Sequence, residues 1–478
     1  MYHKYNVIIV GAGFSGLSMG LELYESHETD WMILEQASEV GGTWRENTYP
    51  GSGSDVPSIL YQLKQRPYLQ WSHKYAGQKE ILCYLKSLAE PIKDKIKLSE
   101  KVISIEFINK ASHWLITTNK GTWITRFLIM SMSPLAEPHI PVIQGREDFT
   151  GPQFHTSQWP ENLNYKDKKV AIIGSGASAI QCIETIQPHV NHLTIFQRSA
   201  SWVMSKKNQP ILHNNRFFTN KLLFNFFYLF NYCIQEIKVL FFINPVLMKL
   251  LELIQKRRIA SLIHNPELRS KITPNYPLGC KRIVLSDHYY QVVSSSNVSV
   301  HTSAIQQLTK TGITLVDGTY IEADMIIYAT GFIHDQHIPI QKITANGLQL
   351  KDVWNLKRSA YLGIFVKHFP NLFLLVGPNT GLGHQSLVFM IERQTRYLNK
   401  FIKYLLKQKV KEVSVKPHKQ ELYQQMIEVR NPGTVWQKGC QSWYVNGKGE
   451  NVALWPFSSL YYWWLTKDYN KNDFEIRL

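Results

Sequence analysis

Cysteine is scarce in this chain of 478 residues, which contains five. No two of them form a CxxC pair or share a metal-ligand spacing, so the sequence predicts neither a dithiol redox centre nor a zinc site. The motifs HExxH and GxxxxGK[ST] are also missing, which argues against a zinc hydrolase and a P-loop nucleotide hydrolase. We therefore expect reduced thiols, no disulfide and no bound metal.

Acidic residues are few relative to basic ones, with 36 Asp and Glu against 53 Lys and Arg and a formal charge of +17. Because the cations are spread along the chain, nucleic-acid binding is the weaker interpretation, and polyanionic cofactors account for part of the excess. The first apolar run, 5–10, leads directly into a glycine turn, which leaves no room for a secretory signal. We therefore expect a cytoplasmic protein.

A strand, a glycine turn, a helix and a second strand open the chain. The strand 6–10 precedes Gly11-Ala-Gly13-Phe-Ser-Gly16, an amphipathic stretch follows, and the strand 31–35 ends at Glu35. In such a turn the first glycine permits the tight bend, the second lets the backbone approach a pyrophosphate, and the third lets helix and strand pack closely. Glu35 lies near the spacing at which a carboxylate binds a ribose. A glycine turn alone also occurs as a plain loop, but the agreement of all four parts predicts a dinucleotide site.

The same pattern recurs with strands at 169–173 and 192–196 around Gly174-Ser-Gly176-Ala-Ser-Ala179. The offset that reaches Glu35 in the first copy reaches Arg198 in the second, followed by Ser199. A guanidinium there would pair with the 2′-phosphate of NADPH, so we expect NADPH rather than NADH. The alternative is that Arg198 is a solvated residue at a strand end.

Two dinucleotide sites in one chain indicate one bound flavin and one exchanging nicotinamide, with hydride passing between them. The strand-like run 324–332 supports this, because it ends at Thr330 and Gly331 in a small-residue turn suited to close approach of a cofactor. By itself such a turn would be only a chain crossing.

The segment between the two motifs resembles the type I Baeyer–Villiger monooxygenases of the flavin-containing monooxygenase superfamily. Phe149-Thr-Gly151-Pro-Gln-Phe-His155-Thr-Ser-Gln-Trp159-Pro160 matches the family pattern FxGxxxHxxxW(P/D) at every defined position. Further similar stretches are Gly41-Gly42-Thr43-Trp44, Tyr49-Pro-Gly51 with Asp55, Gly279-Cys-Lys281-Arg282, Phe369-Pro-Asn-Leu-Phe373 and Gly377-Pro-Asn-Thr380. The resemblance thus spans almost the whole chain. The alternative for His155 and Trp159 is a packing pair between domains.

The resemblance implies FAD and NADPH as cofactors and O2 as co-substrate, with a ketone converted to an ester or lactone through a C4a-peroxyflavin. Arg282 matches the active-site arginine of the family and Asp55 its carboxylate partner. Lys281 would join Arg198 at the 2′-phosphate. Gly42, Thr43, Trp44 and Trp443 would help to form the cofactor pocket. The plainer alternatives are a turn residue for Asp55 and a core residue for Trp443.

These patterns predict an α/β fold with two Rossmann-like dinucleotide-binding domains and a helical insertion. The expected parts are 1–145 and 329–478 for the FAD domain, 146–204 and 279–328 for the NADPH domain, and 205–278 for the insertion. The linkers around 138–160 and near Gly331 are the expected hinges.

The insertion is rich in long apolar and aromatic residues, and its run 222–243 is long enough to span a bilayer. Its polar and charged residues argue against a spanning helix. Packing on its own domain, where it would cover an apolar substrate channel, is the favoured prediction, and a weak membrane-surface contact stays open.

Other functions stay open as alternatives. The nearest is an oxygenase that acts on sulfur or nitrogen with the same cofactors, against which Trp159 and the pairing of Asp55 with Arg282 argue. An NADPH oxidase and a non-catalytic flavoprotein at a membrane surface are the others. The sequence makes no prediction of the particular ketone or of the oligomeric state.

Overall fold

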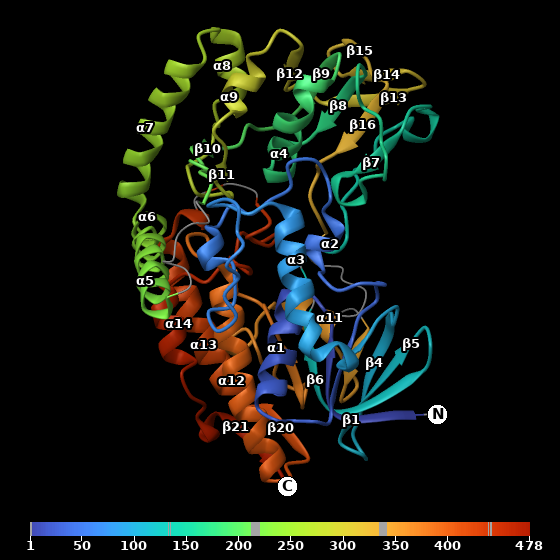
Figure 1. Cartoon of the computed structure of the whole chain (residues 1–478), viewed down its shortest axis with the longest axis vertical. Coiled ribbons are helices and arrows are strands. Elements are labelled where there is room, and N and C mark those ends of the chain that lie inside the picture. The colour runs from blue at the N-terminus through green and yellow to red at the C-terminus, as the bar shows by residue number, and fades with distance from the viewer. Residues whose placement is uncertain are drawn as a thin grey trace.

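The computed structural model describes residues 2–131, 133, 135–211, 220–333, 342–437, 439 and 442–478. Two sheets lie toward opposite ends of an elongated molecule, and the helices of the insertion run along one side of it (Figure 1). The short 3-10 helices are η1 Ser58–Leu60, η2 Glu90–Lys95, η3 Arg146–Asp148, η4 Thr156–Gln158, η5 Gln187–His189, η6 Asn431–Gly433, η7 Val435–Gln437 and η8 Lys471–Asp473.

The sheet of the first domain has nine strands in the order β18-β17-β4-β5-β6-β1-β2-β3, with β19 also paired to β6. They are β1 Tyr2–Val10, β2 Trp31–Leu34, β3 Ile96–Lys97, β4 Val102–Ile108, β5 His113–Thr118, β6 Thr122–Met130, β17 Ile343–Ala345, β18 Leu348–Gln349 and β19 Leu372–Leu374. β1 is parallel to both β2 and β6 and lies between them. Its residues 7–10 are all buried, which explains their unbroken apolar run.

The helices of the first domain come from both the early and the late part of the chain. They are α1 Phe14–Glu25, α2 Thr43–Glu46, α3 Gln78–Ala89, α11 Leu350–Leu356, α12 Leu387–Lys407, α13 Pro417–Arg430 and α14 Ser459–Leu465, and a small sheet pairs β20 Glu412–Val415 with β21 Phe474–Arg477. α1 lies against α12, so residues nearly 400 positions apart share one core. The first domain is therefore built from two separate parts of the chain.

The second domain holds a parallel sheet in the order β12-β9-β8-β16-β7. Its strands are β7 Gln153–His155, β8 Lys169–Ile173, β9 His192–Phe196, β12 Val298–His301 and β16 Met325–Tyr328, with α4 Ala177–Ile186 and α9 Tyr289–Val293 beside them. Smaller sheets contain β10 Val203–Met204 with β11 Val284–Leu285, and β13 Ile305–Thr309, β14 Gly312–Leu315 and β15 Tyr320–Glu322. The predicted α/β fold with two dinucleotide-binding domains is confirmed, whereas the domain limits stay a prediction.

The insertion contains α5 Lys221–Ile237, α6 Val239–Ile243, α7 Pro245–Leu262 and α8 Pro266–Ile272. α7 contacts α9 of its own domain, but α5 packs on the first domain. There Phe224 and Tyr228 of α5 form a buried cluster with Leu60. The prediction that the insertion packs on its own domain is therefore wrong for α5, because the apolar partners of its inner aromatic stripe come from the first domain.

The two connections between the domains run side by side. The backbone nitrogen of His139 donates to the carbonyl oxygen of Gly331 at 2.8 Å, and Pro138 pairs with Phe332 in an isolated bridge. The two predicted hinge segments are thus in direct contact, and their role as hinges stays a prediction.

One described cysteine, Cys280, differs from the expectation of reduced thiols. Cys83, Cys182 and Cys233 are free thiols, whereas Cys280 is disulfide-bonded. The prediction of reduced thiols alone is therefore wrong for Cys280. The fold brings this buried sulfur to a bonding partner, which spacing along the sequence does not reveal. Cys440 lies outside the described residues.

Candidate active site

A cavity of about 440 Å³ opens where β1 and β2 end, which is the usual place for a ligand in a parallel sheet. The predicted cofactor residues that line it are Gly11, Gly13, Glu35, Gly42, Thr43 and Trp44. The first residues of α12, which belong to the late part of the chain, complete the wall, so both parts of the first domain are needed to form it. The sequence motif and the cavity therefore coincide.

The glycines of the first turn fit a dinucleotide. A Cβ on Gly16 would stand 1.9 Å from the carbonyl oxygen of Gly11, so only glycine lets α1 begin this close to β1. At Gly13, by contrast, the nearest protein atom to such a Cβ is 3.8 Å away, and the residue borders the cavity. The backbone there is open to a pyrophosphate at the N-terminus of α1, as FAD requires.

Glu35 is held rigidly at the rim of the cavity. Its carboxylate accepts hydrogen bonds from the backbone nitrogens of Ala12 at 2.7 Å and Ala37 at 2.9 Å, and the residue is buried. The carboxylate is thus fixed beside the glycine turn, where a ribose of the dinucleotide would lie.

An aromatic wall that sequence reasoning missed closes one side of the cavity. Trp44 Nε1 donates to Tyr61 Oη at 3.1 Å, and the Tyr61 ring packs edge-on against Trp44 and Phe14, each at 5.6 Å between centroids. Burial raises the pKa of Tyr61 to about 12, so its hydroxyl stays protonated. No sequence motif marks Tyr61, because its role depends on tertiary contact with Trp44.

Asp55 and Arg282 form a two-point ion pair across the domain boundary. Arg282 Nε donates to Asp55 Oδ2 at 2.7 Å and Nη2 donates to Oδ1 at 2.6 Å. Burial opposes ionisation of Asp55, but the charge and hydrogen bonds of Arg282 hold its pKa below the ordinary value. The negative charge of Asp55 raises the pKa of Arg282 in turn. Both groups are therefore charged at neutral pH.

The ion pair lies beside the cavity and keeps the guanidinium accessible. Tyr61, which lines the cavity, lies within electrostatic range of both Asp55 and Arg282. The Arg282 side chain is 46% exposed, and its second terminal nitrogen takes no part in the contact with Asp55. The Tyr444 hydroxyl also accepts a hydrogen bond from the guanidinium, which is thus a positive, oriented and partly exposed group beside the cavity.

Docking of the segment before Asp55 on α4 fixes this geometry. Tyr49 Oη donates to Gln181 Oε1 at 2.8 Å, and Gln181 Nε2 donates to the carbonyl oxygen of Gly53 at 3.0 Å. Gly51 has a φ of +82°, and a Cβ there would stand 2.4 Å from the Gln181 carbonyl oxygen. The small residues of this segment therefore allow the close contact that places Asp55 opposite Arg282.

The second nucleotide site gathers two cations and a hydroxyl. Lys281 Nζ donates to Ser199 Oγ at 3.2 Å and lies 4.5 Å above the ring of Tyr276. Burial and the neighbouring charge of Arg198 lower the pKa of Lys281. Because a dianionic phosphate would relieve this repulsion, the site fits the 2′-phosphate of NADPH.

Comparison with known proteins agrees with this geometry. Residues 8–238 match the family model described as pyridine nucleotide-disulphide oxidoreductase. The chain is 36% identical to a Baeyer–Villiger monooxygenase of Pseudomonas aeruginosa, over 98% of this chain and 91% of that protein. It is 34% identical to a Baeyer–Villiger monooxygenase of Streptomyces coelicolor, over 95% of this chain and 89% of that protein. The chain belongs to the Baeyer–Villiger monooxygenase family.

Solved structures support the fold of this monooxygenase over its full length. The closed crystal structure of cyclohexanone monooxygenase has a TM-score of 0.90 at 22% identity and covers 100% of both chains. Oxidized steroid monooxygenase bound to NADP has a TM-score of 0.88 at 26% identity and covers 99% of both. As a family member the protein is an NADPH-dependent flavin monooxygenase with FAD, which confirms the predictions of family, enzyme class and cofactors.

The residues of the family pattern, from Phe149 to Trp159, are not among the described residues that line the cofactor cavity. His155 is fully buried at the domain crossing, with Nδ1 2.9 Å from Ser157 Oγ and its ring edge-on to Phe332. Trp159 packs edge-on against Phe154. Phe149 is buried, and a Cβ on Gly151 would stand 2.2 Å from the Asp324 carbonyl oxygen. The contact of His155 with Phe332 favours coupling of the domains for His155, whereas the described ring contacts of Trp159 lie within its own domain.

Three further predicted cofactor residues lie apart from the described lining of the cavity. The Thr330 hydroxyl donates to the carbonyl oxygen of His139, which places Thr330 and Gly331 at the domain crossing. Trp443 is 40% exposed and packs on Tyr444. Tyr444 itself is buried beside Arg282. Contacts of Thr330, Gly331 and Trp443 with a cofactor stay a prediction.

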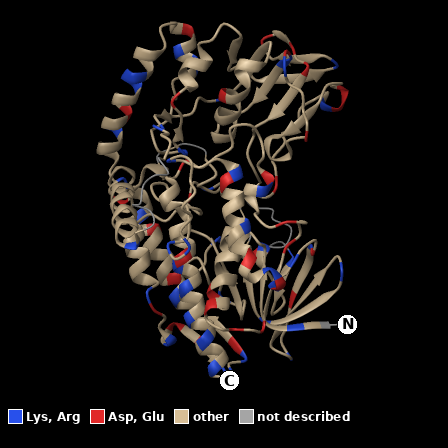
Figure 2. Cartoon of the chain, viewed as in Figure 1, with Lys and Arg blue, Asp and Glu red and all other residues tan. Residues whose placement is uncertain are grey.

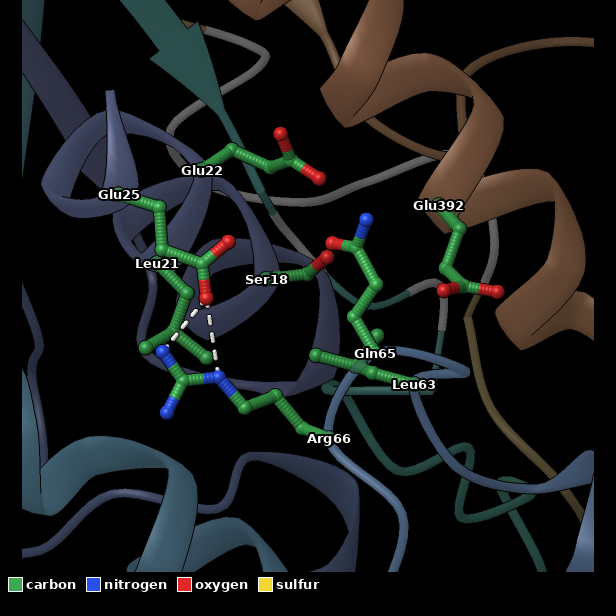
Figure 3. A pocket seen from close by; sticks show the side chains of 8 residues that line it. All are labelled: Ser18, Leu21, Glu22, Glu25, Leu63, Gln65, Arg66 and Glu392. Atoms are coloured by element: carbon green, nitrogen blue, oxygen red, sulfur yellow. Dashed lines mark hydrogen bonds and ion pairs between the residues drawn. The ribbon is translucent and has the colours of Figure 1, made fainter. Parts of the chain in front are cut away.

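A much smaller pocket between α1 and α12 offers no second site. Its volume is about 10 Å³, which is room for roughly one water molecule. Figure 3 shows Arg66 paired with Glu25 at its edge, and the Nε–Oε1 distance is 3.0 Å. Glu392 on the opposite wall is buried, and burial raises its pKa. No cofactor fits there.

Gly176→Ala should separate cofactor binding from folding. No heavy atom lies within 4 Å of the position that a Cβ would take, and its φ of −76° suits alanine. We expect an unchanged thermal midpoint but a KM for NADPH raised by about tenfold or more, because the methyl group would stand where the pyrophosphate approaches α4. Gly121→Ala is the matched control, since that position is equally open. An unchanged KM would contradict the assignment.

His155 should make stability depend on pH. Burial lowers the pKa of His155 to about 4, against 6.5 in the unfolded chain. The folded protein therefore favours the neutral ring, whose contribution is fully present above pH 6.5 and is lost as the pH falls toward 4. It amounts to as much as about 3 kcal/mol. Thermal midpoints measured from pH 7 to 4.5 should fall less steeply for His155→Gln than for the wild type or for the exposed control His264→Gln. Parallel curves would disprove this role.

Proposed function

We propose that this monooxygenase inserts one oxygen atom of O2 beside the carbonyl of an apolar ketone, with Arg282 as the residue that directs the reaction to the carbonyl. The balance is ketone, O2, NADPH and a proton giving ester or lactone, water and NADP+. The observation that carries the proposal is the two-point pair of Asp55 and Arg282 beside the cofactor cavity.

Bound FAD, reduced by NADPH, supplies the activated oxygen. Arg282 would stabilise that oxygen in its negatively charged form, which attacks a carbonyl carbon. A protonated form would instead oxidise sulfides and amines. Arginine suits this task because it stays charged beside apolar groups. The same guanidinium would stabilise the oxyanion formed on the carbonyl. A carbon–carbon bond and the oxygen–oxygen bond then break, a new carbon–oxygen bond forms, and the second oxygen atom leaves and ends as water.

Asp55 would act as a positioning residue. Its two oxygens hold the guanidinium in one plane, and its charge partly balances that of Arg282. Because Asp55 belongs to the first domain and Arg282 to the second, the pair is complete only when the domains are docked. The contacts of Gln181 with Tyr49 and Gly53 set that docking.

A substrate panel tests the proposal. Purified holoenzyme would be mixed with NADPH and with paired substrates, cyclic and long-chain ketones against sulfides and amines of similar size, and products would be identified by mass. Esters or lactones from the ketones are expected as the main products. Sulfoxides or N-oxides alone would favour the related oxygenase function. NADPH consumption with hydrogen peroxide as the only product would favour an oxidase.

A further inference from the structure

The insertion and α14 carry exposed apolar side chains on one side of the molecule, here called the outer face. It includes Phe226, Phe230 and Ile237 of α5, Leu250 of α7, and Trp463 and Trp464 of α14, all between 43% and 64% exposed. Scattered apolar residues are normal on a protein surface, but a contiguous set of large ones marks a contact site.

The helix α5 is apolar on two opposite stripes. Phe224, Tyr228 and Tyr232 are buried against the first domain, whereas Phe226 and Phe230 project from the other side. A helix that is apolar all round is normally enclosed by protein or by lipid. Only one stripe has a protein partner among the described residues, so the outer stripe needs another apolar environment.

The helix lies on the protein surface instead of standing free. The segment Lys221–Ile243 is long and apolar enough to cross a membrane by length and composition alone. However, Glu236 accepts hydrogen bonds from the backbone nitrogen of Ser459 at 2.7 Å and from its hydroxyl at 2.5 Å, and Tyr232 Oη lies 2.6 Å from the same hydroxyl. A helix fixed to a folded domain along its length cannot be surrounded by lipid, but it can lie flat on a bilayer.

The hydrogen bonds between Glu236 and Ser459 also hold α14 beside α5. Ser459 begins α14, and the backbone nitrogen of Leu460 lies 3.4 Å from Glu236. α14 thus lies next to α5, as Figure 1 shows. It contributes Trp463 and Trp464, and Lys467 Nζ lies 5.9 Å from the Trp464 ring. Tryptophan and lysine together are typical of a membrane–water interface.

Positive charge predominates on the insertion helices of the outer face. The helices α5 to α7, together with Lys238 between α5 and α6, carry six cations, namely Lys221, Lys238, Lys249, Lys256, Arg257 and Arg258. They carry two carboxylates, and both are engaged: Glu236 with Ser459, and Glu252 with Lys256 and the backbone of Leu278. Figure 2 shows α5 and α6 mostly tan and α7 with several blue residues. A second copy on a two-fold axis would oppose these cations to one another, so charge disfavours a dimer there.

We propose that the enzyme docks on an anionic phospholipid bilayer through this outer face, without spanning it. The large apolar side chains would enter the interface between headgroups and acyl chains, and the surrounding cations would pair with the headgroups. Docking of this kind is independent of which substrate the enzyme oxidises.

Vesicle sedimentation of the FAD-loaded enzyme tests the proposal. Vesicles of phosphatidylcholine alone would be compared with vesicles of phosphatidylcholine and phosphatidylglycerol at four to one. We expect the enzyme to sediment with the anionic vesicles and much less with the neutral ones. Each cation near an anionic surface contributes roughly fivefold to binding. Lys249→Gln with Arg257→Gln should therefore weaken binding to anionic vesicles roughly twentyfold.

A matched pair of triple variants isolates the apolar contribution. Phe226→Ser, Phe230→Ser and Ile237→Ser together should lower binding by about tenfold or more. The control Val316→Ser, Leu356→Ser and Leu478→Ser changes apolar residues elsewhere that are 63% to 81% exposed, and it should bind as the wild type does. Flavin absorbance and ketone turnover without lipid should be unchanged in both. Wild-type enzyme that stays in the supernatant with both kinds of vesicle would overturn the proposal. So would concentration-dependent dimers that only the first variant abolishes.

Discussion

Arg282→Ala is expected to lower ester formation by about a hundredfold to a thousandfold while the protein stays yellow and still consumes NADPH. The loss of one charged donor aimed at a developing oxyanion typically has this effect. The change leaves the cofactor cavity intact, because Arg282 is not among the described residues that line it. Ester yield by mass and NADPH loss by absorbance would be measured together, with hydrogen peroxide as the expected alternative product.

Two variants control for this result. Arg282→Lys keeps the charge but cannot pair with both oxygens of Asp55, so we expect intermediate ester formation. Asp55→Asn keeps the shape of the side chain but removes its charge, and we expect a smaller loss than for Arg282→Ala because the guanidinium remains. Full ester formation by Arg282→Ala would rule out the role assigned to this residue.

Arg198→Ala combined with Lys281→Ala should raise the KM for NADPH by about a hundredfold and leave the KM for NADH nearly unchanged. Charge-assisted hydrogen bonds to a phosphate contribute about 1.5 to 3 kcal/mol each, and NADH has no 2′-phosphate to lose them. Steady-state oxidation of both nucleotides would be measured. The control is Lys168→Ala, an exposed cation just before β8, at the end of the strand opposite the glycine turn. Equal losses with NADPH and NADH would contradict a 2′-phosphate site.

Local patterns predicted the nucleotide-binding parts of this fold closely. The expected strands 169–173 and 192–196 are β8 and β9 residue for residue. The first strand is longer than expected, because residues 2–5 gain pairing partners on β6. The glycine turn, Glu35 and the segment Gly42-Thr43-Trp44 all border the cavity. Each of these features depends on spacing within a short stretch, which a sequence displays directly.

Features that depend on distant contacts were not predicted. Tyr61 enters the site through its hydrogen bond with Trp44, and α5 finds its partners in the other domain. The bonding of Cys280 likewise depends on the folded chain. The pairing of Asp55 with Arg282, 227 positions apart, followed from family resemblance and not from spacing.

Oxygen labelling tests the central claim most directly. The wild-type enzyme would turn over NADPH and a ketone under ¹⁸O₂, and the product mass would be measured. The account predicts an ester or lactone that carries one labelled oxygen atom, with the second labelled atom in water. A ketone recovered unchanged while NADPH is consumed, or an ester without label, would contradict it.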